Sequence, residues 1–179
     1  MSEVRIIGGQ WKRSKLPVAD KPGLRPTPDR VRETLFNWLG QDLEGWRVLD
    51  AFAGSGALGF EAGSRKATEV LLLERDAQLA KGLTQNKLRL KAENLRIECT
   101  DAMGWMARCA PDRFELVLLD PPFGSDLFEA AQQAAARLVV PDGFVYLEAD
   151  REVEAVAGLS PWRSGRAGAV HYALFQRRG

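Results

Sequence analysis

Cysteine and histidine, the residues that hold structural metals and cross-links, are scarce in this sequence. It has one histidine and two cysteines, Cys99 and Cys109, among 179 residues. The cysteines lack CxxC spacing, so we interpret them as reduced thiols and expect no metal site. No apolar run approaches the roughly 18 residues of a membrane span, and the first residues lack the apolar stretch of a signal peptide. We therefore expect a cytoplasmic protein that does not bind membranes; the sequence leaves the oligomeric state open, with a monomer favoured.

Charge is nearly balanced overall but unevenly distributed. The net charge is +1, yet residues 1–32 carry eight basic and three acidic residues, or +5. Residues 159–179 carry four arginines and no acid, or +4, which leaves −8 for the middle of the chain. Basic ends on an acidic body favour contact with a polyanion such as nucleic acid. The alternative is a solvated surface on which the charges cluster by chance.

The chain is expected to form one compact unit that begins with a basic arm. Hydrophobic residues make up 45% of the chain and charged residues 27%, which is an ordinary globular balance. Residues 4–18 are interpreted as a small hairpin or irregular arm. We assign residues 1–26 to this arm and residues 27–179 to the main domain.

A helix is predicted to follow the arm. Thr27 is expected to cap it, and Pro28 suits the first helical position. Val31, Leu35 and Trp38 recur at helical spacing and predict one apolar face. Arg30 and Arg32 are assigned to other faces of this helix.

Short apolar runs then alternate with helix-length segments, which predicts a parallel sheet covered on both faces. Residues 151–158 are expected to form a short helix, and the last two strands a hairpin at one sheet edge. The prediction is an α/β fold with a seven-stranded, mostly parallel sheet and a terminal antiparallel hairpin. The expected strands lie at 48–49, 70–73, 95–97, 116–119, 144–147, 162–166 and 169–176.

The segment from Gly54 to Gly59 matches GxGxxG between a strand and a helix, and Glu74 lies twenty residues after Gly54. This pattern alone would indicate a dinucleotide site. However, Asp50 lies four residues before Gly54, where a carboxylate would repel a pyrophosphate and attract an ammonium group. The chain is also too short for a second nucleotide-binding half. We therefore favour a cationic nucleoside ligand such as S-adenosylmethionine; a tight turn without a ligand is the alternative.

Two further acidic residues are candidates for holding such a ligand. The Glu74 carboxylate can accept hydrogen bonds from both ribose hydroxyls. Asp101 follows the third strand of the alternating region and can accept a hydrogen bond from an adenine amino group. An aspartate before a helix is often only a cap, so both interpretations of Asp101 stay open.

The segment Asp120-Pro121-Pro122-Phe123 follows the fourth strand. Two prolines fix the backbone and remove two N–H donors, which leaves carbonyl acceptors. Phe123 offers a flat face for stacking a base. The Asp120 carboxylate and the Pro121 carbonyl can grip both N–H bonds of an exocyclic amine and aim its lone pair at a methyl group. A rigid turn is the alternative, and whether Asp120 takes the proton stays open.

The glycine segment from Val48 to Gly59, together with Asp120 to Phe123, resembles the Rossmann-like class I methyltransferases that act on amino nitrogens. Over nearly the whole chain, the sequence is more closely similar to the bacterial 16S ribosomal RNA guanine-N2 methyltransferases. This resemblance rests on Arg5 to Trp11, Leu24 to Thr27 and Asp29 to Leu39.

The resemblance implies methylation of the N2 amino group of a guanine in 16S ribosomal RNA, with S-adenosylmethionine as cofactor and an assembled or assembling small ribosomal subunit as partner. It implies catalysis at Asp120, Pro121, Pro122 and Phe123. The expected cofactor-binding residues are Asp50, Phe52, Ala53, Gly54, Ser55, Gly56, Glu74 and Asp101. The expected RNA-binding residues are Arg5, Trp11, Lys12, Arg13, Arg25 and Arg30.

Some of these residues have alternative interpretations. Trp11 suits either stacking on RNA or a place in a small apolar core. Arg25 and Arg30 suit a phosphate grip, the ordering of a substrate loop, or a solvated face. For the whole chain, the alternatives are another RNA or DNA amino-methyltransferase, a non-catalytic RNA-binding protein and a nicotinamide-dependent oxidoreductase.

Overall fold

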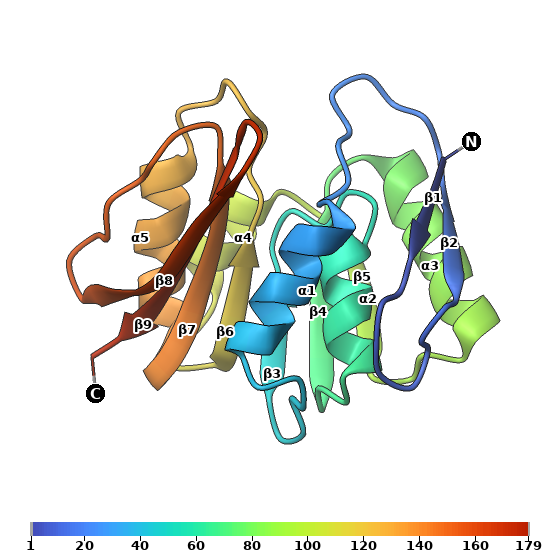
Figure 1. The fold of residues 1–179 in the computed structure, drawn as a ribbon, viewed down its shortest axis with the longest axis horizontal. Helices are drawn as coiled ribbons and strands as arrows, with labels where there is room; N and C mark the ends of the chain where they lie inside the picture. Colours follow the sequence, from blue (N-terminus) through green and yellow to red (C-terminus); the bar gives the residue numbers. More distant parts are fainter. Residues whose placement is uncertain (1, 179) are drawn as a thin grey trace.

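The computed structural model describes residues 2–178 and contains a central sheet with helices on both faces (Figure 1). The helices are α1 (Asp29–Trp38), α2 (Ala57–Ser64), α3 (Ala77–Leu90), α4 (Ala102–Arg108) and α5 (Phe128–Leu138). The central sheet contains β3 (Arg47–Asp50), β4 (Glu69–Glu74), β5 (Leu95–Cys99), β6 (Phe114–Leu119), β7 (Val139–Ala149), β8 (Leu159–Ala167) and β9 (Val170–Arg177). A separate hairpin consists of β1 (Ser2–Arg5) and β2 (Lys15–Val18).

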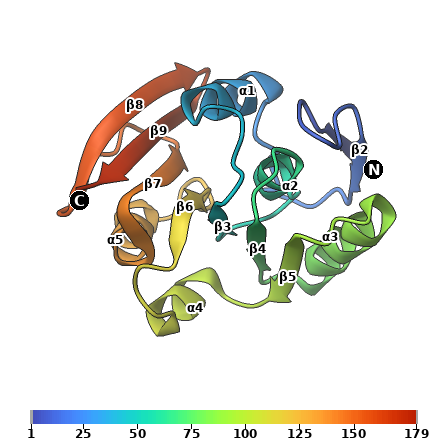
Figure 2. The same cartoon turned by 90° about the horizontal axis from the view of Figure 1, so that it is seen from below.

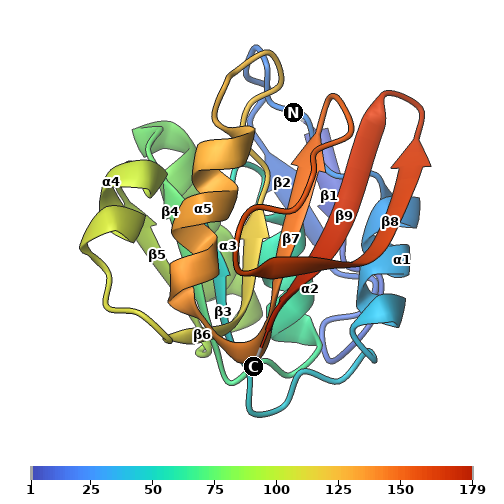
Figure 3. The same cartoon turned by 90° about the vertical axis from the view of Figure 1, so that its left-hand side faces the viewer.

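The seven strands lie in the order β5-β4-β3-β6-β7-β9-β8. The strands from β5 to β7 are parallel to their neighbours, and β9 runs antiparallel to both β7 and β8. Figure 3 shows this terminal hairpin extending the sheet beyond β7. The predicted α/β fold with a mostly parallel sheet and a terminal hairpin is confirmed. From β3, the chain adds β4 and β5 on one side and then β6 and β7 on the other, so the strand order reverses between β3 and β6. A ligand crevice is expected at the carboxyl ends of the strands at such a point.

Each face of the sheet has its own hydrophobic core, because neighbouring residues in a strand point to opposite faces. Val48 belongs to the core that includes residues of α1, α2 and α3, whereas Leu49 belongs to the core formed with α4 and α5. Leu116 and Val117 are divided between the cores in the same way. Figure 2, which looks along the sheet, shows α1 and α2 on one side and α4 and α5 on the other.

The predicted N-terminal hairpin is confirmed, and it packs onto the first of these cores. Val4, Leu16 and Val18 are buried in that core. Helix α3 holds strand β2: Asn86 Nδ2 donates to the Pro17 carbonyl at 3.2 Å, and Arg89 Nη2 donates to the Lys15 carbonyl at 2.6 Å. The hairpin is therefore fastened to the body by both apolar contacts and hydrogen bonds.

The helix expected at residues 151–158 is absent, and this prediction was wrong. Gln132 of α5 takes up the backbone groups that a helix would pair internally. Its Nε2 donates to the Glu154 carbonyl at 3.0 Å, and its Oε1 accepts from the Val156 N–H at 2.7 Å. The segment therefore runs in an irregular conformation along the second core.

One expectation for the start of α1 was also wrong. Thr27 does not cap the helix; its hydroxyl donates to Glu148 Oε2 at 2.8 Å, and Pro28 occupies the N-cap position. Arg32, which the sequence assigned only to another face of the helix, is buried, and its side chain is 1% exposed. Both side chains turn inward because a buried carboxylate lies within reach of each.

Arg32 forms ion pairs with Asp29 and with the fully buried Glu61 of α2. Glu61 Oε1 accepts from Arg32 Nη1 and from the Ile7 N–H, at 3.0 and 2.9 Å. Its Oε2 accepts from Arg65 Nε and from the Gly8 N–H, both at 3.0 Å. One carboxylate thus satisfies two guanidinium groups and two backbone amides from three parts of the chain.

We expect Glu61→Gln to lower the free energy of unfolding by about 3–5 kcal/mol, because it removes the buried negative charge that Arg32 and Arg65 share and leaves Arg32 with the half-exposed ion pair to Asp29. Urea unfolding at neutral pH measures this change. The matched control is Glu98→Gln, which breaks an ion pair with Arg96 whose side chain is 66% exposed; it should cost no more than about 1 kcal/mol. Equal effects of the two substitutions would contradict the role assigned to Glu61.

Candidate active site

A cavity of about 540 Å³ opens at the carboxyl ends of the parallel strands. Its size is that of a typical small-molecule site. Its walls come from the segment between β2 and α1 and from the segments that follow β3, β4, β5 and β6. In Figure 1 these connections lie at the upper end of the sheet. Polar and charged residues in the walls are Arg25, Thr27, Ser55, Glu74, Arg75, Thr100, Asp101 and Asp120.

The glycine loop forms one wall. Phe52, Ala53, Gly54 and Ser55 line the cavity. Gly56 lies behind this wall and caps α2 with a φ of +85°, a conformation that glycine adopts easily. A Cβ atom at Gly56 would also lie 2.6 Å from Leu83 Cδ2. The loop therefore presents backbone to the cavity with little side-chain bulk.

Glu74 fixes the shape of this loop. Its Oε1 accepts from the Gly54 N–H at 2.9 Å, and its Oε2 accepts from the Asp76 N–H at 2.8 Å. The carboxylate thereby joins the loop after β3 to the end of β4. Because each carboxylate oxygen has a second lone pair, the half-buried side chain can also accept hydrogen bonds from a ligand in the cavity.

Asp101 both caps a helix and lines the cavity. Its Oδ2 accepts from the Gly104 N–H at 2.9 Å at the start of α4. Its side chain is exposed and belongs to the cavity wall. The capping interpretation of Asp101 is therefore correct, and its position still permits contact with a ligand.

Asp50 lies beneath the glycine loop and does not line the cavity. Its Oδ2 accepts from the Gly59 N–H at 2.9 Å, and its Oδ1 is buried without a hydrogen-bond partner among the described residues. A Cβ at Gly59 would lie 2.8 Å from Oδ2, so the glycine permits this approach. Burial raises the pKa of Asp50 to about 7, and the nearby negative charges of Glu74 and Glu148 add to the effect.

The Asp120-Pro121-Pro122-Phe123 segment forms another part of the wall, where Arg25 contacts it. Arg25 Nη2 donates to Asp120 Oδ1 at 3.2 Å. The Arg25 Cζ atom lies 3.6 Å from the centroid of the Phe123 ring, within cation–π distance. Arg25 therefore contacts both residues that we expected to hold a target base.

Glu148 lies next to this group and is completely buried. Its Oε2 accepts from the Tyr146 hydroxyl and the Thr27 hydroxyl, both at 2.8 Å. Its Oε1 has no hydrogen-bond partner among residues 2–178 and lies 3.7 Å from Arg25 Nη1, which is also buried and unpartnered. Burial raises the pKa of both Asp120 and Glu148; the charge of Glu148 raises the pKa of Asp120 further, and Arg25 opposes this rise.

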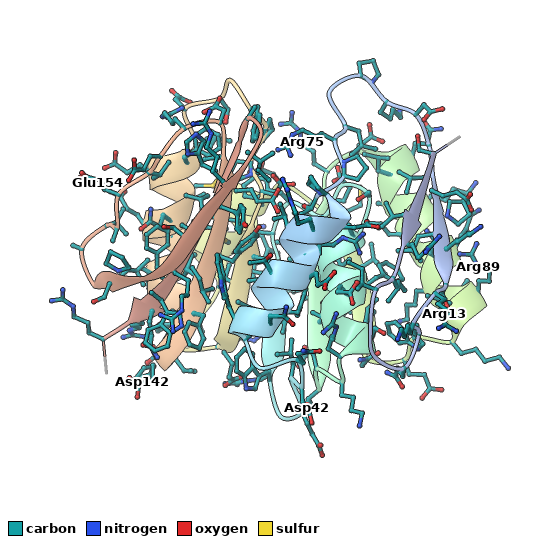
Figure 4. All side chains as sticks on the ribbon, in the orientation of Figure 1. Arg13, Asp42, Arg75, Arg89, Asp142 and Glu154 are labelled. Carbon is teal, nitrogen blue, oxygen red and sulfur yellow. The ribbon has the colours of Figure 1, made fainter. Side chains whose placement is uncertain are left out.

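Five of the expected RNA-binding residues lie outside the cavity. Trp11 packs against the first core, which agrees with the core alternative. Figure 4 shows Arg13 low on the hairpin side near Arg89, whereas Arg75, a cavity residue, lies at the top. The five residues are Arg5, Trp11, Lys12, Arg13 and Arg30, and all except the half-buried Trp11 are exposed.

From its place directly after an apolar run, the sequence also suggests Glu148 as a residue that structures the rim of the site. Sequence reasoning missed the hydrogen bonds that Glu148 accepts from Thr27 and Tyr146, and it did not anticipate that Arg25 reaches Asp120. Among residues 2–178, no group of three or more metal-binding side chains is present, and no helix is long and apolar enough to cross a membrane.

Solved structures show the same architecture. The putative methyltransferase yhhF of Escherichia coli is 42% identical, with a TM-score of 0.89 over 99% of both chains. An RNA methyltransferase of Salinibacter ruber in complex with S-adenosylhomocysteine shares the fold at 15% identity, with a TM-score of 0.68 over 86% of this chain and 94% of that chain. The fold and the cavity thus define a Rossmann-like class I methyltransferase.

A narrower assignment follows from the sequence comparisons. The family described as Conserved hypothetical protein 95 matches residues 4–176. Ribosomal RNA small subunit methyltransferase D of Escherichia coli is 42% identical over 180 residues, which cover 98% of this chain and 90% of that protein. The chain belongs to this family, as the resemblance predicted.

We expect Asp50 to make stability depend on pH. Its folded pKa of about 7 lies above the unfolded value of about 3.9, so the folded protein holds this proton more tightly. Stability from this group is complete below about pH 4 and is lost as pH rises through about 7. Asp50→Asn keeps an acceptor for the Gly59 N–H and should remove this loss, which is at most about 4 kcal/mol.

Urea unfolding of both proteins without ligand, between about pH 5 and 7.5, measures the difference. Asp76→Asn is the control: N-cap hydrogen bonds lower the pKa of Asp76, so this aspartate is ionised in both the folded and the unfolded protein over this pH range and adds no slope there. Parallel pH profiles of wild type and Asp50→Asn would rule out a raised Asp50 pKa.

Proposed function

We propose that this protein transfers a methyl group from S-adenosylmethionine to the N2 amino group of a guanine in ribosomal RNA of the small subunit. The observation that carries the proposal is that Asp120 and Phe123 line the same cavity as the glycine loop and Glu74. An amine-gripping segment and a nucleoside-binding loop therefore share one cavity. The names of the relatives support ribosomal RNA as the substrate class.

The donor set of the cavity fits S-adenosylmethionine. When bound, this cofactor supplies a methyl group on a positively charged sulfur. Glu74 is suited to accept hydrogen bonds from the ribose hydroxyls, and Asp101 from the adenine amino group. Asp50 stabilises the loop beneath and adds negative charge that favours a cationic ligand. Phe52, Ala53, Gly54 and Ser55 provide the wall, and Gly56 sets the turn behind it.

The part of the wall formed by the Asp120-Pro121-Pro122-Phe123 segment holds the amine. The lone pair of a guanine N2 amino group is delocalised into the ring, so the amine is a poor nucleophile. The Asp120 carboxylate and the Pro121 carbonyl accept hydrogen bonds from the two N–H groups of this amine and so orient its lone pair toward the methyl carbon. Phe123 stacks on the flipped-out base and, with Pro122 fixing the backbone, limits its motion.

Methyl transfer forms a carbon–nitrogen bond and breaks the carbon–sulfur bond, and the amine then loses one proton. The proton passes to Asp120 or to solvent. Burial already raises the pKa of Asp120, which favours its role as a proton acceptor. The low-dielectric setting also strengthens its hydrogen bond to the positively charged amine in the transition state.

The exposed basic residues are proposed to dock the RNA away from the cavity. Arg5, Lys12 and Arg13 belong to the N-terminal hairpin, and Arg30 lies on α1. Their charge favours the phosphate backbone of an assembled or assembling small subunit, while residues 27–179 hold the chemistry. The proposal includes a monomer acting in the cytoplasm without a metal.

Glu74→Ala should weaken binding of S-adenosylmethionine by about 1–3 kcal/mol, because charge-assisted hydrogen bonds to the ribose are lost. Isothermal calorimetry measures the dissociation constant. Glu69→Ala, at the opposite end of the same strand, is the control and should leave that constant unchanged. A folded Glu74→Ala protein with wild-type affinity would remove Glu74 from the site.

Asp120→Ala should slow methyl transfer by at least about a hundredfold while leaving cofactor affinity near the wild-type value, because the grip matters most in the transition state. The measurement is single-turnover transfer of a tritiated methyl group to unmodified small subunits, free 16S RNA and DNA. Mass spectrometry of the nucleosides then identifies the methylated atom.

Asp120→Asn and Phe123→Tyr complete this test. The asparagine retains an acceptor, so partial activity would indicate positioning and no activity would indicate proton transfer. Tyrosine retains the flat face and should be tolerated, whereas Phe123→Ala should weaken substrate binding. A wild-type rate for Asp120→Ala, or a methyl group on a ring atom, contradicts the proposed chemistry.

A further inference from the structure

The position of Arg25 points to a role that differs from a phosphate grip. Arg25 lies in the irregular segment between β2 and α1, and its side chain is 33% exposed. It reaches across the cavity to the end of β6, where it contacts Asp120 and Phe123. A residue that gripped phosphate would instead direct its N–H groups toward solvent and RNA.

The two contacts of Arg25 reproduce the two contacts proposed for the target base. The guanidinium is planar and carries its N–H donors in the plane, so one face can stack while an edge donates. Its centre lies 3.6 Å from the Phe123 ring centroid, and its Nη2 donates to Asp120 at 3.2 Å. Stacking on Phe123 and N–H donation to Asp120 are also what the guanine would require.

The chemical match extends to the atoms of the base. Carbon 2 of guanine is bonded to three nitrogens, N1, N2 and N3, and this fragment is itself a guanidine. N1 and N2 carry adjacent N–H donors along one edge, as the two terminal nitrogens of arginine do. Adenine has no carbon bonded to three nitrogens.

We propose that Arg25 is an internal substitute for the target guanine, which occupies the base site and must withdraw when the base enters. This inference rests on the proposed function. It makes Arg25 a specificity-determining residue, because a site shaped around a guanidinium favours the N2 edge of guanine over the amino edge of adenine.

Glu148 supplies the position to which Arg25 withdraws. Arg25 Nη1 and Glu148 Oε1 form an ion pair at 3.7 Å, beyond hydrogen-bond distance, and neither buried atom has a hydrogen-bond partner among residues 2–178. A small shift of the guanidinium away from Phe123 would join these two atoms. The hydrogen bond formed with Glu148 offsets the stacking and hydrogen bonding that Arg25 gives up to the base, and the positive charge stays beside Asp120.

Substitutions of Arg25 should therefore improve substrate binding, contrary to the expectation for a phosphate contact. Arg25→Lys keeps the charge but removes the planar group, and Arg25→Ala removes both. For each variant we expect KM for unmodified small subunits to fall about three- to tenfold, because the competing occupant has been removed. Arg96→Lys, an exposed arginine on β5, is the matched control and should leave KM unchanged.

A second measurement tests the chemical mimicry directly. Millimolar guanidinium chloride, compared with equal sodium chloride, should inhibit Arg25→Ala competitively with the subunit and at least fivefold more strongly than the wild type. The free ion then binds where the side chain had been. Equal inhibition of the two proteins would overturn the mimicry.

The remaining outcomes separate this inference from the proposed function. A rise in KM for both variants, with a salt dependence reduced by about one ion, would identify Arg25 as a phosphate contact and overturn the proposal. An unchanged KM in folded variants would also overturn it. A wild-type protein that methylates no guanine on small subunits would instead contradict the proposed function.

Discussion

The carboxylate of Glu61 is the point at which the N-terminal hairpin, α1 and α2 are joined. It binds the Ile7 and Gly8 amides, Arg32 of α1 and Arg65 at the end of α2. Because α1 is fixed in this way, the segment that precedes it is held in place along the cavity wall. The placement of Arg25 and Thr27 at the active site therefore depends on a buried ion cluster on the neighbouring helix.

The charged residues at the strand ends differ mainly in their access to water. Glu74 is half-buried and bonded to two backbone amides, whereas Asp50 and Glu148 are almost completely buried, and each has one oxygen without a hydrogen-bond partner in the described part of the chain. The buried carboxylates give the cavity a negative potential that attracts positive charge. Arg25 offsets part of this negative charge from within the protein, and a bound cationic ligand would offset more of it.

The sequence predicted the sheet, the glycine loop and the acidic strand ends because these features depend on local patterns. Short apolar runs between helix-length segments identify strands, and Gly54 and Gly56 identify the turn. Local patterns did not predict the hydrogen-bonded pairs that are far apart in the sequence and that the fold brings together. Examples are Arg25 with Asp120, 95 residues apart, and Thr27 with Glu148, 121 residues apart. Arg32 shows the same limit: helical spacing gave its direction, but only the packing of α1 on α2 supplied the carboxylate that allows its burial.

The terminal hairpin also determines how the sheet ends. Strand β8 is an outer strand, and it contains Pro161, a register irregularity between Pro161 and Arg163, and the exposed side chains of Arg163 and Arg166. Proline lacks an N–H donor, and clustered positive charge repels a like strand from a second copy. At the other outer strand, β5, Arg96 is exposed as well. The β8 border of the sheet thus discourages edge-to-edge aggregation, which protects the folded chain at high concentration.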